Sequence, residues 1–373
     1  MSKSSNTKML QSTAPVPGRS GRWVISRFGP PSVVTWEVAL GELPEAQPGN
    51  ALVRIIAAGI AGPDNIQRAG GYPNERCRLP GFTPGYDFVG EVVQLGSPQN
   101  SISVGDRVAA MCMIGAHATH IELPVPDLLK IDRSDDVVKV CALPLNYMTA
   151  FGMLQRSGVD LAPGSSILIG SAAGGIGTAV AQIVEAFDMK LHMIGTCSPS
   201  KFDYVRSLGV TPIDRHDPNL WRTVRNATLD GQGVDVAYDA IGSEESLLQS
   251  HLATRAETGQ VIAIGIMSDI ATDGSGMTTE MSADELLIRR QLPRMSYWGV
   301  ERAYHQDTRE LWEKDFYNLL DHVRSGQLSP KFAKLLKLSD GVHAHELLVS
   351  GSGVLGKMIF IVDAQLALRL GVT

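Results

Sequence analysis

The sequence is poor in cysteine, in charge and in long apolar runs, and each shortage excludes a class of protein. Charged residues make up 19% of the 373 residues and the net charge is −6, so no basic face for a nucleic acid is indicated. No apolar run approaches the length of a membrane span. The few cysteines have neither the paired spacing of a zinc site nor that of a disulfide framework: Cys77, Cys112, Cys141 and Cys197. We therefore expect a metal-free protein of a reducing compartment, the cytoplasm.

The beginning of the chain also lacks acidic residues. Residues 1–22 are rich in Ser, Thr, Pro and Gly and contain no Asp or Glu. This composition predicts a flexible tail over residues 1–22. A mitochondrial presequence is the alternative, although the periodic apolar face of such a helix is missing.

Glycine is plentiful, with 38 residues, and its most informative cluster is SAAGGIG at residues 171–177. An apolar run, residues 166–170, precedes the cluster, and an amphipathic stretch, residues 178–187, follows it. Strand, glycine turn and helix in this order are the context of a dinucleotide fold. Glycine lets the backbone approach a pyrophosphate, which the helix N-terminus attracts. The expected phosphate-binding residues are Ser171, Ala173, Gly174, Gly175 and Ile176.

The next predicted strand, residues 191–195, decides between the two nicotinamide cofactors. An NAD site has an acid at the end of this strand to bind the ribose 2′-hydroxyl, but here Thr196 and Cys197 follow the strand. Hydroxyls and cations come next, and they suit a 2′-phosphate. The sequence therefore predicts NADPH, held by Ser198, Ser200, Lys201 and Arg215. The plainer alternative, a helix-capping turn, is compatible with phosphate binding at the same place.

The order of elements predicts two domains of an α/β protein. Short apolar segments with Gly and Pro between them, typical of a mainly β domain, run over residues 23–129. A helical pattern follows over residues 137–158. Strands and helices then alternate up to a last strand at residues 295–299. This alternation predicts a doubly wound parallel sheet of the Rossmann type, covered on both faces.

Several segments, in the same order, resemble the medium-chain dehydrogenase/reductase superfamily. They are TPGYDFVG at 83–90, GDRV at 105–108, NYMTAF at 146–151, the glycine cluster and GSGVLGKMIFI at 351–361. The nearest resemblance is to the zinc-free quinone oxidoreductases, including ζ-crystallin-like and vesicle-amine-transport-protein-like members. It implies a GroES-like, mainly β catalytic domain and a Rossmann NADPH-binding domain.

The resemblance covers residues 23–362 and also implies boundaries and assembly. The catalytic domain would occupy residues 23–147, the cofactor domain residues 148–297, and a return to the catalytic domain residues 298–373. A homodimer joined through the strand at residues 295–299 is expected, because an unpaired apolar edge strand is a liability unless it is covered.

Zinc-dependent members of the superfamily have a Cys ligand near Ala61 and Gly-His-Glu where this chain has Gly85-Tyr86-Asp87. Without these ligands no Lewis acid is expected to polarise an alcohol or a carbonyl. Alcohol dehydrogenase activity is therefore not predicted. Two further histidines, His117 and His120, are interpreted as packing or surface residues.

The resemblance also implies roles for single residues. It places Tyr72 over the nicotinamide, as the group that stabilises charge or donates a proton; the alternative is that Tyr72 only lines the pocket. It places Asn146, as a catalytic residue, and Thr149 near the nicotinamide, where helix capping and packing are the alternatives. The remaining implied cofactor contacts are Asp64, Gly265, Ile266, Leu355 and Gly356. One departure from the family is that its Asn-Pro before this Asp is Gly62-Pro63 here.

A metal-free site with NADPH can deliver a hydride to an acceptor that is already electrophilic, because the incoming charge delocalises onto oxygen. The sequence therefore predicts an NADPH-dependent reductase of small hydrophobic quinones or α,β-unsaturated carbonyl compounds (enones). Two alternatives stay open. One is an enoyl-thioester reductase acting on CoA or carrier-protein substrates. The other is a nucleotide-binding interaction protein with little turnover, which the altered loop at residues 61–62 would permit.

Overall fold

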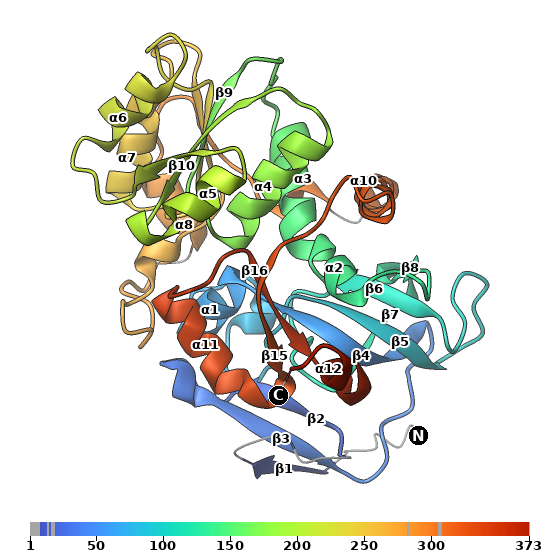
Figure 1. The fold of residues 1–373 in the computed structure, drawn as a ribbon. Coiled ribbons are helices and arrows are strands. Elements are labelled where there is room, and N and C mark those ends of the chain that lie inside the picture. Colours follow the sequence, from blue (N-terminus) through green and yellow to red (C-terminus); the bar gives the residue numbers. More distant parts are fainter. Residues whose placement is uncertain (1–7, 13–14, 16–18, 282, 305–307, 373) are drawn as a thin grey trace.

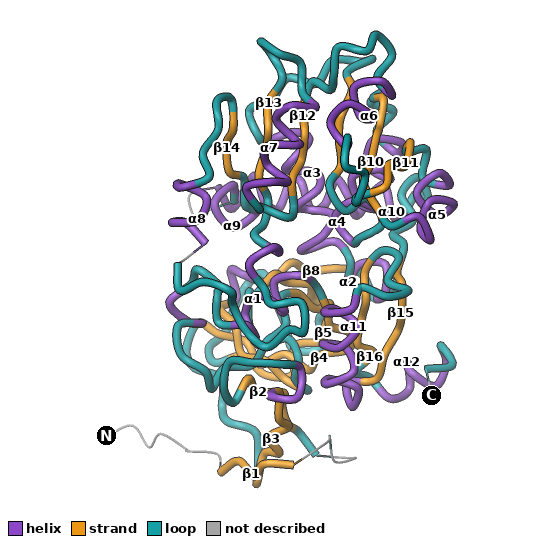
Figure 2. The backbone as a smooth tube through the Cα atoms, turned by 90° about the vertical axis from the view of Figure 1, so that its left-hand side faces the viewer, coloured by secondary structure: helices purple, strands orange, loops and turns teal. Residues whose placement is uncertain are grey.

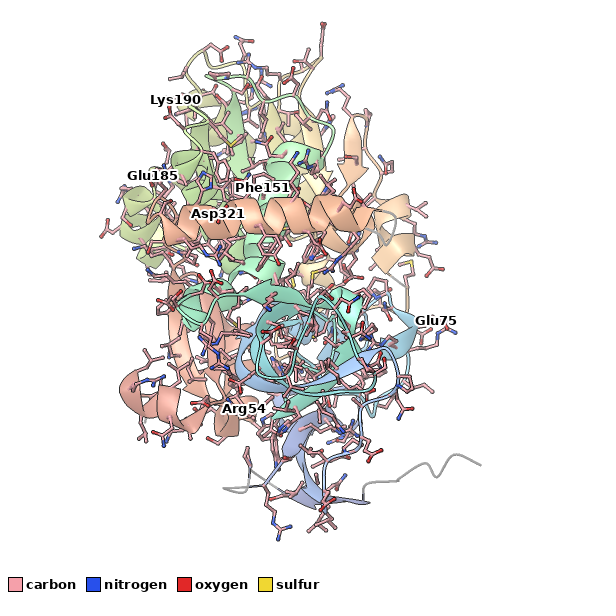
Figure 3. The ribbon with its side chains drawn as sticks, turned by 90° about the vertical axis from the view of Figure 1, so that its right-hand side faces the viewer. Arg54, Glu75, Phe151, Glu185, Lys190 and Asp321 are labelled. Carbon is pink, nitrogen blue, oxygen red and sulfur yellow. The ribbon has the colours of Figure 1, made fainter. Side chains whose placement is uncertain are left out.

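The structure is a computed structural model that describes residues 8–12, 15, 19–281, 283–304 and 308–372. One parallel sheet with its helices occupies the upper part of Figure 1, and two further β-sheets form the lower, mainly β part. A long helix, α10 (Arg309–Arg324), runs along the boundary between the two parts (Figure 3). None of the described helices combines the length and the apolar character needed to cross a lipid bilayer.

The upper sheet has six parallel strands in the order β11-β10-β9-β12-β13-β14 (Figure 2). The chain starts in the middle at β9, builds outward to β11, and then crosses back to β12 on the other side. This is the doubly wound order, which confirms the predicted Rossmann fold. The strands are β9 (Ser166–Ile169), β10 (His192–Cys197), β11 (Thr211–Asp214), β12 (Val236–Asp239), β13 (Gln260–Ala263) and β14 (Met295–Tyr297).

Both faces of this sheet are covered, as its continuous apolar strands require. In β9, Ile167 and Ile169 join one buried cluster with α3 and α4, whereas Leu168 joins another with α6 and α7. Side chains therefore alternate between two helical layers. The helices are α3 (Met148–Arg156), α4 (Gly175–Ala186), α5 (Phe202–Ser207), α6 (Leu220–Ala227), α7 (Glu244–Ala253), α8 (Ala283–Arg289) and α9 (Val300–Ala303).

The lower part is built around a seven-stranded sheet in the order β15-β16-β4-β5-β6-β8, with β7 paired to β4. The end of the chain returns to this sheet, because β16 pairs antiparallel with β4. This mainly β part is the GroES-like domain that we expected. Its strands are β4 (Asn50–Ile60), β5 (Asp87–Leu95), β6 (Arg107–Met111), β7 (His120–Pro124), β8 (Leu129–Ile131), β15 (Phe332–Lys337) and β16 (Lys357–Ile361).

Short helices surround the lower sheet and connect it to the upper part. A π-helix, η4 (Leu143–Tyr147), lies between α2 and α3 and leads from one part to the other. The remaining helices are α1 (Gly62–Ala69), α2 (Val137–Cys141), α11 (Gly341–Ser350) and α12 (Ala364–Arg369).

The prediction of a flexible tail over residues 1–22 is wrong for the part of it that forms strands. β1 (Lys8–Ser12) pairs antiparallel with β3 (Val34–Leu40), and β2 (Gly21–Ile25) pairs with the other side of β3. The physical reason is that the edge of β3 presents backbone N–H and C=O groups that an extended segment of almost any composition can pair. Residues 1–7, 13–14 and 16–18 lie outside the described residues, and the other domain boundaries stay predictions.

A buried ion pair fastens the end of the chain into the lower sheet. The Lys357 ammonium on β16 donates to the Asp87 carboxylate on β5, and the two side chains are 1% and 0% exposed. The backbone N–H of Leu145, in η4, donates to the same carboxylate over 3.1 Å. A Cβ on Gly59 would lie 1.9 Å from Asp87 Oδ1, so β4 leaves just enough room for the pair.

Lys357→Met is expected to lower the free energy of unfolding by about 3–5 kcal/mol, because it leaves a buried carboxylate without its cation. The measurement is urea unfolding. The double variant Asp87→Leu/Lys357→Met should recover part of this loss. Arg54→Met is the matched control, since Arg54 pairs with Asp363 at a half-exposed site and should lose at most about 1 kcal/mol. Equal losses for Lys357→Met and Arg54→Met would contradict the anchoring role.

Candidate functional site

The glycine loop connects β9 to α4 at the carboxyl edge of the parallel sheet. Ser171 has a positive φ of 58°, and the N–H of Ala172 donates to the carbonyl of Thr196 at the end of β10 over 2.9 Å. Across the described part of the chain, no side chain caps the N-terminus of α4. Its first N–H groups therefore remain for an anion, as in other dinucleotide sites.

Two segments from distant parts of the sequence meet at this loop. A Cβ on Gly175 would lie 2.0 Å from Nδ2 of Asn146, which η4 carries. Gly356, which has a φ of 92°, pairs as an isolated β-bridge with Gly174, and its N–H donates to the Ala173 carbonyl over 3.0 Å. Leu355 beside it is partly buried. The structure thus brings Asn146 and residues 355–356 against the predicted phosphate loop.

Two buried polar atoms at this junction are left for a ligand. Asn146 is 3% exposed and Thr149 is 6% exposed. Among the described residues, Asn146 Oδ1 and Thr149 Oγ1 have no hydrogen-bond partner. A buried polar atom without a partner is costly, and a bound group can supply the missing hydrogen bond. These oxygens, together with the bare end of α4, fit a dinucleotide.

The end of β10 carries cations and hydroxyls in place of an acid. Lys201 Nζ donates to the carbonyls of Gly351 and Val354 over 2.9 and 3.2 Å. The pKa of the Lys201 ammonium is lowered mainly by burial and, to a smaller extent, by the positive charge of the Arg215 guanidinium. The two cations are therefore close enough to interact electrostatically. Ser198 is half-buried and Ser200 is exposed. This group suits a phosphate, but its role stays a prediction.

The Cys197 thiol in the same strand is buried, and burial raises its pKa. A thiol that keeps its proton is a poor nucleophile. The other three cysteines are also buried free thiols.

Two further loops lie at the same edge of the sheet. Gly265 approaches the loop after β12 so closely that a Cβ on it would lie 2.8 Å from the Ala240 carbonyl oxygen, and Ile266 is 3% exposed. Asp239 holds the first of these loops, since one carboxylate oxygen accepts from the N–H groups of Ile241 and Gly242 over 2.9 and 2.8 Å. We did not predict Asp239, although an acid directly before a glycine-containing turn at the end of a strand was a usable signal.

Tyr72, which follows α1, belongs to a second group of polar side chains. Its hydroxyl is hydrogen-bonded to that of Tyr86 and donates to the carboxylate of Glu301 at the start of α9. The two rings meet edge to face with centroids 6.1 Å apart. Burial, and then the charge of Glu301, raise the pKa of Tyr72, so the hydroxyl keeps its proton. Sequence reasoning named neither Tyr86 nor Glu301 as a site residue.

Asp64 is fully buried, and the structure gives its carboxylate a capping role. One oxygen accepts from the Ala61 N–H over 2.8 Å and the other from the Gly85 N–H over 2.9 Å. Since both oxygens are used by the backbone, the predicted contact of Asp64 with the cofactor stays a prediction.

The two histidines take part in packing. His117 Nε2 lies 2.9 Å from the Gly59 carbonyl oxygen, and burial lowers the pKa of His120 to about 4. Among the described residues, no three or more His, Cys, Asp or Glu side chains lie together in a way that could hold a metal ion.

Comparison with known proteins identifies the family. The alcohol dehydrogenase GroES-like domain model matches residues 47–129, and the zinc-binding dehydrogenase model matches residues 175–314. A quinone oxidoreductase-like protein 2 homolog of Nematostella vectensis is 30% identical over 306 residues, which are 81% of this chain and 78% of that protein. The chain belongs to the zinc-free quinone oxidoreductase branch of the medium-chain dehydrogenase/reductase superfamily.

Other known proteins are similar to this chain over different lengths. The human synaptic vesicle membrane protein VAT-1 homolog is 29% identical over 65% of this chain, which spans 60% of that protein's length. A quinone oxidoreductase structure from Pseudomonas syringae is 25% identical, with a TM-score of 0.76, and covers 92% of this chain and 100% of its own.

Two structures of lower identity share the fold. The Escherichia coli quinone oxidoreductase complexed with NADPH is 22% identical, with a TM-score of 0.77 over 92% of this chain and 100% of its own. The CurK enoyl reductase is 20% identical, with a TM-score of 0.74 over 92% of this chain and 99% of its own.

Proposed function

We propose that this chain is an NADPH-dependent reductase that transfers a hydride to a quinone or an enone without a metal ion. The observation that carries the proposal is the hydroxyl pair of Tyr72 and Tyr86. Tyr86 stands where the zinc-dependent members have a histidine ligand. A protonated hydroxyl donor at that place can stabilise an oxyanion, which is what reduction of a conjugated carbonyl requires.

The junction of η4 with the glycine loop supports the choice of cofactor. The bare N-terminus of α4 would hold the pyrophosphate, and Asn146 Oδ1 and Thr149 Oγ1 would accept hydrogen bonds from the nicotinamide half. Lys201 and Arg215 would bind the 2′-phosphate, as the absence of an acid at the end of β10 indicates. Bound NADPH supplies the hydride. The NADPH complex of the Escherichia coli relative supports this assignment.

The substrate side needs a hydrogen-bond donor and an apolar surface. Addition of a hydride to the acceptor moves an electron pair onto its oxygen, as a phenolate or an enolate. Tyr72 donates its hydroxyl hydrogen to that oxygen, and burial keeps the hydroxyl protonated for this role. A small hydrophobic conjugated carbonyl compound is therefore the proposed substrate.

An enoyl thioester is the second candidate acceptor. Its carbonyl takes up charge in the same way, and the CurK enoyl reductase has the same fold. The rate of NADPH oxidation with a panel of quinones, enones and enoyl-CoA compounds distinguishes the two candidate substrate classes. If none of these compounds oxidises NADPH, the alternative of a nucleotide-binding interaction protein with little turnover is favoured.

Tyr72→Phe is expected to lower kcat for the best acceptor by about 10²–10³, because one oxyanion donor is removed. The Kd for NADPH should stay nearly unchanged, and chelators should have no effect on the wild type. Tyr317→Phe is the matched control, since it also removes a hydrogen-bonded hydroxyl but on α10. If Tyr72→Phe keeps the kcat of the wild type, Tyr72 only lines the pocket and is not the oxyanion donor.

Lys201→Ala is expected to weaken NADPH at least about tenfold relative to NADH, because a charge-assisted hydrogen bond contributes roughly 1.5–3 kcal/mol. The ratio of the two Kd values is the readout, since loss of the contacts with Gly351 and Val354 affects both cofactors alike. Lys314→Ala, at an exposed position on α10, is the control. If the ratio of the Kd values for NADPH and NADH is unchanged, Lys201 does not bind the 2′-phosphate.

We also propose a homodimer formed through β14, the last strand of the upper sheet. Two apolar side chains lie exposed near this edge, Tyr297 at 37% and Ile288 on α8 at 74%. Covering them and the backbone edge favours association. Analytical ultracentrifugation at micromolar concentration should give twice the chain mass, and a monomer would contradict the proposal.

A further inference from the structure

One chain of hydrogen bonds crosses from the lower part of the molecule to the upper part. Tyr86 and Tyr72 belong to the lower part, and Glu301, 229 residues after Tyr72 in the sequence, belongs to the upper part. Tyr86 is 2% exposed, whereas Tyr72 and Glu301 are both partly exposed. Tyr72 and Glu301 are therefore accessible from outside the protein, whereas Tyr86 is not.

In this resting arrangement the hydroxyl hydrogens of both tyrosines are already donated within the chain of hydrogen bonds. The single hydroxyl hydrogen of Tyr72 is donated to the Glu301 carboxylate, so the hydrogen between the two tyrosines must come from Tyr86. No hydroxyl hydrogen is then left for an acceptor oxygen. A carboxylate next to Tyr72 would also repel the oxyanion that forms there.

A proton on Glu301 removes both obstacles. The carboxyl O–H then donates to the Tyr72 oxygen, and the Tyr72 hydrogen turns toward the substrate. The negative charge beside the oxyanion disappears in the same step. Reduction of a conjugated carbonyl consumes one proton for each hydride, so a proton store at this place matches the stoichiometry.

We propose that Glu301 stores the proton that the reduction consumes and delivers it through Tyr72 to the acceptor oxygen. This inference rests on the proposed function. Glu301 acts through Tyr72 and is in that sense a positioning residue.

The acceptor carbon receives a hydride from the bound cofactor, and the π electron pair moves to the acceptor oxygen. The Tyr72 O–H bond breaks and its proton joins that oxygen, while the Glu301 O–H bond breaks and its proton joins the Tyr72 oxygen. Glu301 is left as a carboxylate, and it takes the next proton from water.

The other titratable groups near Tyr72 do not compete for this role. They are Tyr297 on β14 and Cys77. The Cys77 thiol in turn interacts electrostatically with Arg76 and Asp64. Burial raises the pKa of the Cys77 thiol to about 11. A carboxyl group is ordinarily far more acidic than a phenol or a thiol, so we take Glu301 as the group that exchanges the proton.

The first test is steady-state kinetics of Glu301→Gln with the best acceptor. The amide still donates to Tyr72 but has no acidic proton, so kcat should fall at least about tenfold, toward the range of lost general acid catalysis. The solvent deuterium isotope effect on kcat should rise, because proton supply becomes slower. The Kd for NADPH and the thermal midpoint should not change.

Two further variants sharpen this test. Glu301→Asp should recover part of kcat, and Glu310→Gln, at an exposed position on α10, should behave as the wild type. If Glu301→Gln has a kcat equal to or above that of the wild type, the carboxylate merely competes with the substrate for Tyr72, and the proposal is overturned.

A second measurement separates this inference from the proposed function. Binding of 4-nitrophenolate, as an oxyanion probe, to the NADP⁺-saturated protein is measured by calorimetry in two buffers of different ionisation enthalpy. The wild type should take up about one proton more for each bound probe than Glu301→Gln. Equal uptake, or no uptake by the wild type, overturns the role of Glu301. If the wild type reduces no acceptor, the proposed function fails while this measurement still decides the role of Glu301.

Discussion

The buried pair of Asp87 and Lys357 is the contact on which the geometry of the junction depends. Two segments of the site are connected to this pair. Leu145, whose N–H donates to the Asp87 carboxylate, directly precedes Asn146. Gly356, which is bridged to the glycine loop, directly precedes Lys357. In a medium of low dielectric constant neither charge can be left alone. The pair therefore fixes η4 and the returning end of the chain relative to each other, although they are more than 200 residues apart.

Features with a local signal were the ones that the sequence predicted well. The strands Ser166–Ile169 and Met295–Tyr297 begin at the residues predicted for the strands at 166–170 and 295–299. The glycine loop was recognisable because strand, turn and helix are adjacent in sequence, and a tight turn needs glycine whatever the rest of the fold. The acid missing at the end of β10 is equally local.

Features that depend on distant partners were not predictable in the same way. β15 was missed because only one of its six residues is buried, and its shape comes from pairing with β16. Lys357 and Asp87 were each part of a recognised motif, yet a single sequence does not show which charges meet. Glu301 carried no signal at all, since one acid in a helix usually faces water. The contacts of Asp64 with the backbone N–H groups of Ala61 and Gly85 were also not predictable, and its contact with the cofactor stays a prediction.

Hydride transfer and proton supply in the proposed reaction therefore depend on different parts of the structure. The hydride side depends on η4 and the glycine loop, which the Asp87–Lys357 pair holds in place. The proton side depends on α9, which follows the edge strand β14 directly. A shift of β14 would move Glu301 relative to Tyr72 and leave Asn146 and Gly175 in contact. Because a hydrogen bond weakens steeply with distance and angle, proton supply would respond to such a shift before cofactor binding does. In a dimer formed through β14, assembly would then act on the proton step.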